Sequence, residues 1–378
     1  MPPVGLMIKP ASGRCNLRCR YCFYRDEANH RKEADYGIMS ESTLDRLLQR
    51  VFDYAEGEVS VVFQGGEPTL AGLPFYENYL RLVKQYNRKN LPVYNSIQTN
   101  GVLIDENWVE LFRRGRFLVG LSLDGPLVVH DRLRPDAFGK GTAKQVLHAA
   151  QMLKKAGVDV NILCVVTATN ADNAKRLYNF YKKQGFGYLQ FIPCIESFDG
   201  DGGKDYALTA EEYGKFLTDL FHCWYEDAIK GSPLYIRYFD NLMQVIAGRV
   251  PEYCGMRGGC ANQYVCEADG GIYPCDFYVL DEYRLGSILT DSLQDCDRKR
   301  KEITFVEQSR RLPEDCLACP YFRLCRSGCM RERKHGKSRY CEGYKAFFRT
   351  AAPALQTLLA QLMKRRERQN LDTVWHQR

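Results

Sequence analysis

The chain has 378 residues, of which 45% are apolar and 26% charged, so it is long enough to bury the cores of two or three globular domains. The first ten residues lack the pattern of a secretory signal, and no apolar run approaches the ~20 residues that span a bilayer. We therefore expect a cytoplasmic protein, in which disulfides are rare, and we interpret most of its sixteen cysteines as metal ligands.

The formal net charge of +7 comes largely from lysines and arginines near the C-terminus. The simplest interpretation is a solvated surface. A second is compensation of anionic metal clusters, because nearby cations lower the cost of burying them. Nucleic-acid binding is a weaker third, since no recognisable nucleic-acid module accompanies the basic run.

Hydrophobic periodicity predicts strands and helices that alternate along the first half of the chain. Strands are expected at 5–10, 59–64, 93–99, 117–123, 158–167 and 188–193. Helices are expected at 40–56, 74–86, 105–114, 142–156 and 172–184, the third of them capped by Asp105. Several strands are nearly continuous apolar runs, which is typical of a parallel sheet that is buried on both faces.

The polar and glycine-rich sequences follow these strands. They are the cysteine-rich loop after the first strand and the sequences 65–68, 98–100 and 122–124. Because strand ends carry the chemistry in parallel α/β barrels, we expect these sequences on one rim of a partial, roughly (β/α)6 barrel over 1–240. A helix at 209–229 and a strand at 234–239 are expected to lead out of it.

The sequence changes character after about residue 241. The segment 254–341 is rich in Cys, Gly, Pro and Arg and has little periodicity, so we expect metal clusters to hold it together. We assign 241–345 to this cluster-bearing domain and 346–378 to a C-terminal helix, which begins at about residue 344 and packs an apolar face on the body.

Cys15, Cys19 and Cys22 stand at a C-x3-C-x2-C spacing after the first predicted strand. Three thiolates on one loop can hold three corners of a cubane iron–sulfur cluster, which usually takes four, so one iron is left open for a small molecule. A zinc site is the alternative, but zinc prefers four ligands and the nearest downstream histidine is His30. The turn Gly65-Gly66-Glu67-Pro68, taken alone, could be ordinary.

Together with Tyr21, this loop and turn resemble the signature of the radical S-adenosylmethionine (SAM) enzymes. The resemblance implies that Cys15, Cys19 and Cys22 bind a [4Fe–4S] cluster. It also implies that the turn meets the amino group of SAM, while that amino group and the carboxylate chelate the open iron. The implied SAM-binding residues are Tyr21, Gly65, Gly66, Glu67, Ser122, Arg134 and, at the adenine, Ile195.

The downstream cysteines are similar in spacing to those of the SPASM domain, which carries two auxiliary [4Fe–4S] clusters. The implied ligands of the first are Cys254, Cys260, Cys275 and Cys329, and those of the second are Cys316, Cys319, Cys325 and Cys341. Four thiolates leave no open iron, so these clusters would serve electron transfer or structure. A zinc ribbon over 316–329 is the alternative. The remaining cysteines are expected to act as small apolar residues: Cys164, Cys194, Cys223, Cys266 and Cys296.

A closer resemblance, to the anaerobic sulfatase-maturating enzymes, covers nearly the whole chain. It is carried by 8–10, 64–70, 95–101, 118–126, 161–167, 189–192, 236–240 and 273–280. These enzymes convert a Cys or Ser within a C/S-x-P/A-x-R motif of a sulfatase to Cα-formylglycine.

The resemblance implies that Asp276 is the general base, although a turn or capping role is the other reading of that residue. It implies Cβ hydrogen abstraction by a SAM-derived radical, with the second electron leaving through the auxiliary clusters. The implied partners are an unfolded sulfatase polypeptide or peptide and an external low-potential electron donor, without nucleic acid or membrane.

Two other functions stay open at this point. One is a SPASM enzyme that forms a crosslink or thioether in a ribosomal peptide, which a precursor-binding winged-helix domain would favour; we recognise none in the sequence. The other is a non-catalytic iron–sulfur or zinc protein. The sequence does not indicate whether Cys or Ser is the preferred target.

Overall fold

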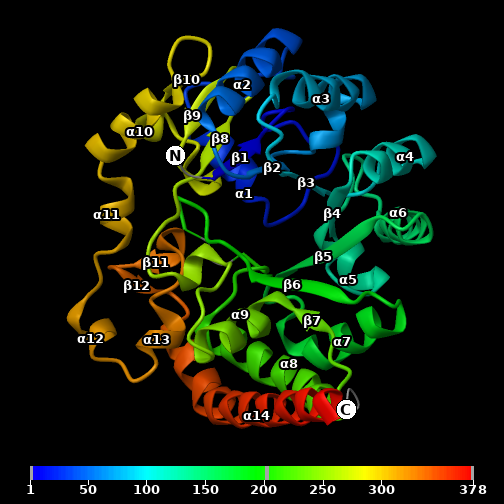
Figure 1. The fold of residues 1–378 in the computed structure, drawn as a ribbon, viewed down its shortest axis with the longest axis vertical. Helices are drawn as coiled ribbons and strands as arrows, with labels where there is room; N and C mark the ends of the chain where they lie inside the picture. The colour runs from blue at the N-terminus through cyan, green and yellow to red at the C-terminus, as the bar shows by residue number, and fades with distance from the viewer. Residues whose placement is uncertain (1–2, 201–203, 376–378) are drawn as a thin grey trace. The chain divides into compact units, whose positions relative to one another are not determined.

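The computed structural model describes residues 3–200 and 204–375, with side chains as far as residue 364. The chain divides into two compact units, each built from three segments (Figure 1). Unit 1 comprises Met1–Val165, Cys194–Tyr206 and Ala261–Ser309, and unit 2 comprises Val166–Pro193, Ala207–Cys260 and Arg310–Arg378. The predicted division at 240 and 345 stays a prediction. Every helix in the described part of the chain is too short or too polar to cross a membrane.

Unit 1 is organised around parallel strands that the sequence predicted. They are β1 (Val4–Ile8), β2 (Val59–Phe63), β3 (Val93–Thr99), β4 (Phe117–Ser122) and β5 (Asp159–Val166), paired in this order. The inward side chains of β2, Val59, Val61 and Phe63, are fully buried, as expected for apolar runs in a covered sheet. Three short strands extend the sheet beyond β1: β8 (Tyr264–Cys266), β9 (Gly271–Tyr273) and β10 (Gly286–Ser287).

The predicted helices of unit 1 cover the outer side of these strands in Figure 1. They are α2 (Glu41–Tyr54), α3 (Leu73–Tyr86), α4 (Glu106–Arg114) and α6 (Ala143–Lys155). Asp105 caps α4 as predicted, since its carboxylate accepts a hydrogen bond from Trp108 N. Periodicity gave no sign of four shorter helices: α1 (Phe23–Asn29), α5 (Leu127–Leu133), α10 (Leu293–Glu302) and α11 (Phe305–Ser309).

Unit 2 is mostly helical. Its main elements are α7 (Ala174–Lys183), β6 (Tyr188–Pro193), α8 (Ala210–Lys230), β7 (Tyr235–Ile236), α9 (Arg237–Ile246) and α14 (Cys341–Trp375). Short elements hold the cysteine-rich segment: η3 (Cys254–Met256), α12 (Glu314–Leu317), α13 (Phe322–Cys325), η6 (Met330–Glu332), β11 (Arg333–Lys334) and β12 (Lys337–Ser338). β6 and β7 pair in parallel, with Leu189 opposite Ile236.

The predicted strand at 234–239 is wrong beyond its first residues. Only Tyr235 and Ile236 pair as a strand, and the helix α9 starts at Arg237. The buried side chains Phe239, Leu242 and Val245 recur every three residues, so they form one apolar face of a helix. Tyr235, Ile236, Tyr238 and Phe239, residue types that favour strands, concealed that period.

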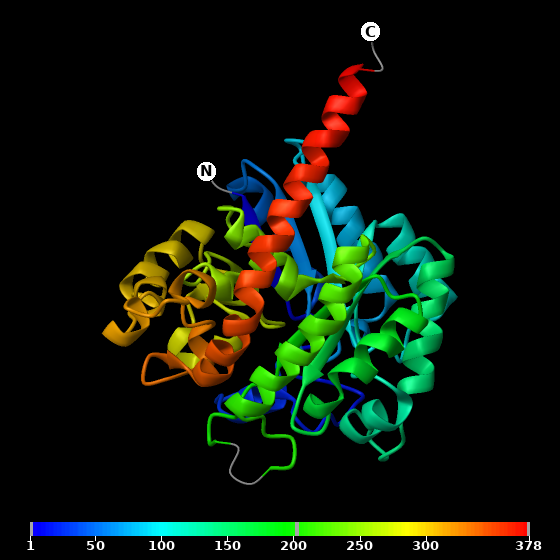
Figure 2. The same ribbon diagram turned by 90° about the horizontal axis from the view of Figure 1, so that it is seen from below.

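The helices α8 and α14 run side by side in unit 2 (Figure 2). Two glycines allow the close approach. A Cβ on Gly343 would lie 2.0 Å from the backbone oxygen of Ala210, and a Cβ on Gly214 would lie 2.5 Å from the Cα of Gly343. No side chain fits at either position, so these two glycines fix where α14 begins against α8.

Candidate active site

The carboxyl ends of β1 to β4 bring the predicted site sequences of unit 1 to one edge of the sheet. β1 leads into the cysteine loop, β2 into the turn at 64–68, β3 into Asn100 and β4 into 122–124. Hydrogen bonds join these ends: Asn100 Nδ2 donates to Asn16 Oδ1 at 2.7 Å, and Gln98 Nε2 donates to Ser122 Oγ at 3.1 Å. The predicted rim is therefore present.

The cysteine loop rests directly on the glycine turn. Glu67 N donates to the carbonyl oxygen of Arg14 at 2.7 Å, and Gly66 has a φ of +49°. A Cβ on Gly66 would lie 2.1 Å from that same oxygen, so only glycine fits. The contact between the turn and Arg14 thus fixes the position of the start of the loop that carries Cys15, Cys19 and Cys22.

Glu67 holds the turn rather than facing outward. Its carboxylate is 1% exposed. Oε1 accepts from Thr69 N and Oγ1 and from Thr99 Oγ1, and Oε2 accepts from Asn100 N at 2.7 Å. A carboxylate can accept about four hydrogen bonds, so these bonds occupy all the acceptor positions of Glu67. The prediction that this turn meets the SAM amino group therefore depends on the backbone of Gly65 and Gly66.

Three side chains form a buried group beside the cysteine loop. Asp124 Oδ2 accepts from Arg134 Nε at 2.9 Å and from the hydroxyl of Tyr21. Arg134 also donates to Cys19 Sγ at 3.8 Å. The structure therefore brings the predicted residues Tyr21 and Arg134 together on Asp124, which the sequence placed at a strand end without assigning it a role.

The three cysteines have the chemistry that an iron–sulfur cluster requires. All are free and partly exposed. Burial raises the pKa of Cys15 to about 12 and that of Cys19 to about 11, so both are thiols in the free protein. A bound metal reverses this, because a coordinating thiol loses its proton.

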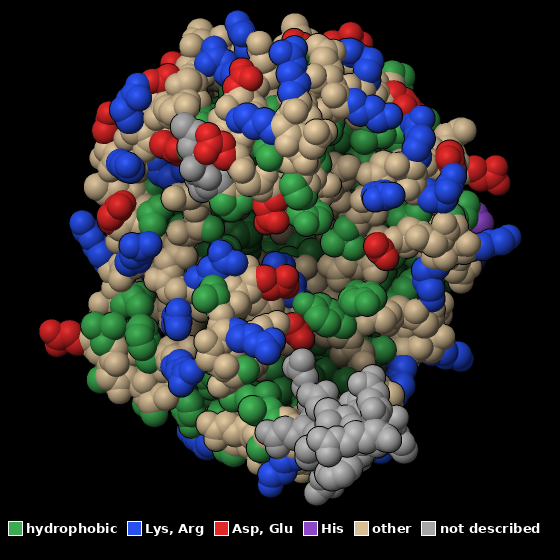
Figure 3. All heavy atoms as spheres, viewed as in Figure 1, with side chains coloured by type: hydrophobic (Ala, Val, Ile, Leu, Met, Phe, Trp, Pro, Cys, Tyr) green, Lys and Arg blue, Asp and Glu red, His purple; other side chains and the backbone are tan. Residues whose placement is uncertain are grey.

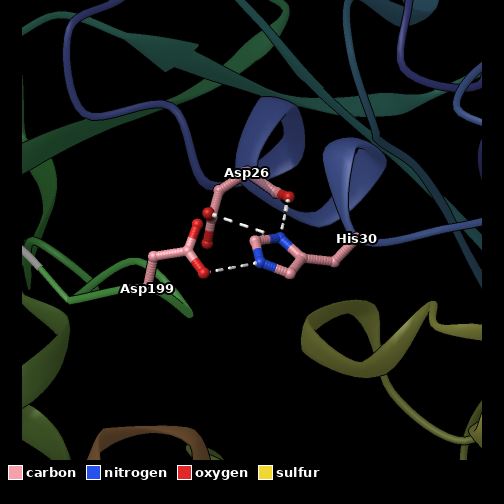
Figure 4. Close-up of side chains that lie close together, drawn as sticks. All are labelled: Asp26, His30 and Asp199. Carbon is pink, nitrogen blue, oxygen red and sulfur yellow. Dashed lines mark hydrogen bonds and ion pairs between the residues drawn. The ribbon is translucent and has the colours of Figure 1, made fainter.

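Ile195, the predicted adenine contact, lines a pocket of about 210 Å³ together with Tyr21, Cys22 and Tyr206. The rim of this pocket contains a side-chain group that the sequence did not reveal, formed by Asp26, His30 and Asp199 (Figure 4). His30 Nδ1 lies 2.8 Å from the carbonyl oxygen of Asp26, and Nε2 lies 3.2 Å from Asp199 Oδ1. These bonds raise the pKa of His30.

Asp276, the predicted base, begins the turn η4 (Asp276–Tyr278) and is 5% exposed. Its Oδ2 accepts hydrogen bonds from the Tyr24 hydroxyl at 2.7 Å and from Gln64 Nε2 at 3.2 Å. Its Oδ1 has no hydrogen-bond partner among the described residues. One carboxylate oxygen is thus held in place and the other is left without a donor.

A buried charge network lies behind Asp276. Lys9 Nζ is 3.0 Å from Glu27 Oε2 and 3.7 Å from Glu267 Oε2, and Arg31 donates to Glu267 at 2.6 Å. Burial raises the pKa of the Asp276 carboxyl, against the opposing effects of Lys9 and of the Tyr24 hydrogen bond. Burial likewise raises the pKa of Glu27 to about 7. Single-sequence patterns gave no sign of this network, because its members come from separate segments.

The four predicted ligands of the second auxiliary cluster meet in unit 2. Cys316, Cys319, Cys325 and Cys341 line one cavity, together with the cationic side chains of Arg326, Lys337 and Lys345. Burial raises the pKa of Cys325 to about 12, and the other three cysteines raise it further by charge repulsion. Four convergent thiols with adjacent cations fit an anionic cluster.

Three predicted ligands of the first auxiliary cluster also lie in unit 2. Burial raises the pKa of Cys329, and Cys254 and Cys260 are close enough to add to that shift. The fourth, Cys275, belongs to unit 1, so its place in this set stays a prediction. Among the other cysteines, Cys164, Cys194, Cys266 and Cys296 are buried, as expected of small apolar residues, and Cys223 is half-buried.

The basic side chains do not gather in one field on the face shown in Figure 3. There, the Lys and Arg side chains of the described residues are scattered among Asp and Glu. This distribution supports the interpretation as a solvated surface, with local compensation of charge at the cysteine cavity of unit 2.

Comparison with known proteins identifies two families in the chain. The radical SAM superfamily matches residues 10–181, and the SPASM iron–sulfur cluster-binding domain matches residues 258–320. A cysteine-type anaerobic sulfatase-maturating enzyme of Clostridium perfringens is 45% identical over 94% of this chain and 98% of its own. A serine-type enzyme of Bacteroides thetaiotaomicron is 30% identical over 98% of this chain and 94% of its own.

A solved structure shows the same fold. Native anSMEcpe with bound AdoMet and the Cp18Cys peptide superposes with a TM-score of 0.90 at 43% identity, covering 96% of this chain and 100% of that chain.

Proposed function

Because the chain belongs to the anaerobic sulfatase-maturating enzymes of the radical SAM superfamily, we propose that it oxidises a Cys or Ser of a sulfatase C/S-x-P/A-x-R segment to Cα-formylglycine. The predictions of a radical SAM fold, a SPASM domain, and SAM and [4Fe–4S] cofactors are confirmed. Cys is the expected better target, since the cysteine-type relative is the more similar of the two compared.

The observation that carries the proposed chemistry is the orphaned oxygen of Asp276. A carboxylate that is buried, held at Oδ2 and without a donor at Oδ1 is prepared to accept one more proton. Its raised pKa makes it a stronger base than an exposed aspartate. Lys9, next to it in the network, keeps the ionised form accessible despite burial.

The residues of the chain divide the work as follows. Cys15, Cys19 and Cys22 hold the first cluster, and the Gly65–Gly66 backbone, Ser122, Arg134 and Ile195 hold SAM. When bound, these cofactors supply a radical that removes one hydrogen atom from the target Cβ. Asp276 takes the thiol or hydroxyl proton.

The predicted auxiliary ligands, Cys254, Cys260, Cys275 and Cys329 and Cys316, Cys319, Cys325 and Cys341, would hold clusters that supply an acceptor for the second electron. The resulting thioaldehyde is hydrolysed to formylglycine and hydrogen sulfide, whereas a serine target gives the aldehyde directly. The target segment enters unfolded, because its Cβ must reach a site that is formed by buried strand ends. We place the reaction in the cytoplasm, where thiols stay reduced, with an external low-potential electron donor.

The test is anaerobic incubation of the reconstituted enzyme with SAM, a reductant and sulfatase-derived peptides that carry Cys, Ser or Ala at the target position. We expect a loss of peptide mass for Cys and Ser, with equal amounts of 5′-deoxyadenosine, and no mass change for Ala. Cleavage of SAM with both target peptides unchanged would contradict the proposal and favour a different peptide substrate.

A further inference from the structure

Unit 2 has a surface groove of about 320 Å³ beside the cavity of the second auxiliary cluster. The end of α9, the loop between Cys319 and Cys325 and the first turns of α14 form it. Its apolar lining includes Tyr321, Leu324, Phe348 and Pro353, and its charged lining residues are Arg323 and Arg349. We name it the Tyr321 groove.

The Tyr321 groove and the cysteine cavity share a wall. Tyr321 and Phe348 line both, and their ring centroids are 5.8 Å apart. Pro320 and, from α13, Arg323 and Leu324 line the groove on a segment whose two ends, Cys319 and Cys325, are cavity residues. A single layer of aromatic side chains therefore separates a molecule in the groove from the cysteine site.

The charge of the groove is uncompensated. Arg323 and Arg349 are exposed, and neither forms an ion pair with any residue that the structure describes. Around the cysteine cavity the two lysines are paired instead: Lys345 lies 3.0 Å from Glu342, and Lys337 is bonded to Asp315. The groove thus combines aromatic and aliphatic side chains with two guanidinium groups that lack a carboxylate partner among the described residues, on a chain with a net charge of +7; Arg323 donates to the carbonyl oxygen of Val245 at 3.4 Å.

We propose that the Tyr321 groove docks a small acidic iron–sulfur carrier protein, which removes one electron per turnover from the Cys316–Cys341 site. The inference rests on the proposed function, in which a fully thiolate-ligated cluster passes an electron outward. One electron moves from that site to the oxidised centre of the carrier. No bond is made or broken and no proton is transferred.

Charge complementarity selects this occupant. An acidic carrier gains from the unpaired arginines, and its encounter rate gains from the net charge of the enzyme. An apolar floor with an arginine rim is the composition that recognition surfaces favour. A basic carrier would meet repulsion at the same place.

The test measures binding and electron transfer between the reconstituted holoenzyme and an acidic 2[4Fe–4S] ferredoxin, without peptide. Stopped flow follows oxidation of the prereduced enzyme by the oxidised ferredoxin, and calorimetry gives the dissociation constant. We expect affinity to fall with added salt and to weaken roughly tenfold in the Arg323→Glu/Arg349→Glu enzyme, with slower transfer. The Arg323→Gln/Arg349→Gln enzyme should lie between the two.

The matched control is Arg176→Glu/Lys183→Glu, an equal change of charge on exposed residues of α7 in the same unit, outside the groove. It should bind ferredoxin as the unchanged enzyme does. Iron content checks that each variant retains its clusters.

Equal weakening by both pairs would show a general charge effect and overturn the docking site. Unchanged ferredoxin binding by the groove variant would also overturn the proposal. So would an enzyme that is a dimer in solution and becomes monomeric on charge reversal while it still binds ferredoxin, because the groove would then be a contact between two copies of the enzyme. Because no peptide is used, failure here is distinct from failure to form formylglycine.

Discussion

At the scale of single residues, two buried carboxylates of the candidate site differ in how many of their acceptor positions are occupied by hydrogen bonds. The carboxylate of Glu67 uses all of its acceptor positions in hydrogen bonds from Thr69, Thr99 and Asn100, so it orients the turn. Asp276 is held at one oxygen only. The two carboxylates are both buried but differ in hydrogen bonding: that of Glu67 is saturated, whereas that of Asp276, the proposed base, has one oxygen without a partner among the described residues.

Replacing Asp276 by Asn should separate SAM cleavage from product formation. The amide keeps the shape of the carboxylate but cannot take the target proton, so formylglycine should fall by about 10²-fold or more. Formation of 5′-deoxyadenosine should continue, because SAM is bound elsewhere. Mass spectrometry of the peptide and chromatography of the nucleoside measure the two yields. Full turnover by the variant would exclude Asp276 as the base.

His30 should make the rim of the Ile195 pocket sensitive to pH. Its pKa is raised, first by the Asp26 carbonyl and then by Asp199, so its contribution to stability is present below the ordinary value of about 6.5. It is lost as pH rises through the raised pKa. We expect hydrogen exchange in residues 195–200 to accelerate as the pH rises above the ordinary histidine pKa of about 6.5, beyond the intrinsic effect of pH. His30→Gln should abolish that excess, and an identical profile in the variant would contradict the assignment.

At the scale of elements, close approaches through glycine determine which segments touch. Gly66 lets the turn meet the Arg14 carbonyl, and Gly343 lets α14 meet α8. Each close approach helps to set the position of a predicted cysteine ligand, Cys15 after Arg14 and Cys341 at the start of α14. Neither contact involves a polar side chain, so both would be missed by a search for catalytic residues alone.

Gly66→Ala should cost far more than a glycine substitution at an open turn. Its Cβ would meet a backbone oxygen at 2.1 Å, which must displace the cysteine loop. Gly157 is the matched control, since its φ is +73° and nothing lies within 4 Å of its Cβ. Gly157→Ala should cost about 1–2 kcal/mol of backbone strain. Gly66→Ala should additionally weaken SAM binding about tenfold or more, which is at least ~1.4 kcal/mol.

Thermal unfolding and equilibrium binding of SAM to the reconstituted variants check this pair. Equal losses in the two variants would show that conformational strain alone is responsible. SAM affinity at the level of the unchanged protein in Gly66→Ala would refute the importance of the close approach.

The sequence predicted the elements that have a clear period and the residues that have a recognisable spacing. The strands β1 to β6 and the three-cysteine loop were found because apolar runs and Cys spacing are local signals. The start of the helix α9 was missed because three aromatic residues and Ile236 within 234–239 favour a strand. The Lys9–Glu27–Glu267 network and the His30 group were missed because they join segments that are distant in sequence, and only tertiary packing assembles them.

At the scale of the whole molecule, the two units contain regular structure of different kinds. Unit 1 has a buried parallel sheet whose stability comes from apolar packing. The cysteine-rich part of unit 2 consists of very short elements between residues 314 and 338. Such a segment buries little apolar surface of its own, so metal binding should supply much of its folding free energy.

Removing iron should therefore unfold one part of the chain first. The reconstituted protein is expected to hold roughly twelve irons in three [4Fe–4S] clusters, and Cys319→Ala to hold roughly eight. Cys223→Ala, at a half-buried cysteine that is not a predicted ligand, should keep all of them. After chelation, limited proteolysis should cut first within residues 310–341, while far-ultraviolet circular dichroism still reports the sheet. Simultaneous loss of both units would contradict this order.

The glycine contact between α8 and α14 also bears on the order in which the chain is synthesised and its iron–sulfur clusters are assembled. Cys341 is the first residue of α14, two positions before Gly343, so it reaches the three cysteines predicted to share its cluster only after that helix has docked. A ribosome releases Cys316, Cys319 and Cys325 while α14 is still being made. These three thiols then stand exposed on an unfinished chain, open to oxidation or to the wrong metal. Assembly of the cluster predicted at these four cysteines must therefore follow synthesis of the chain, and a cell that produces the protein then needs its iron–sulfur supply ready at that moment.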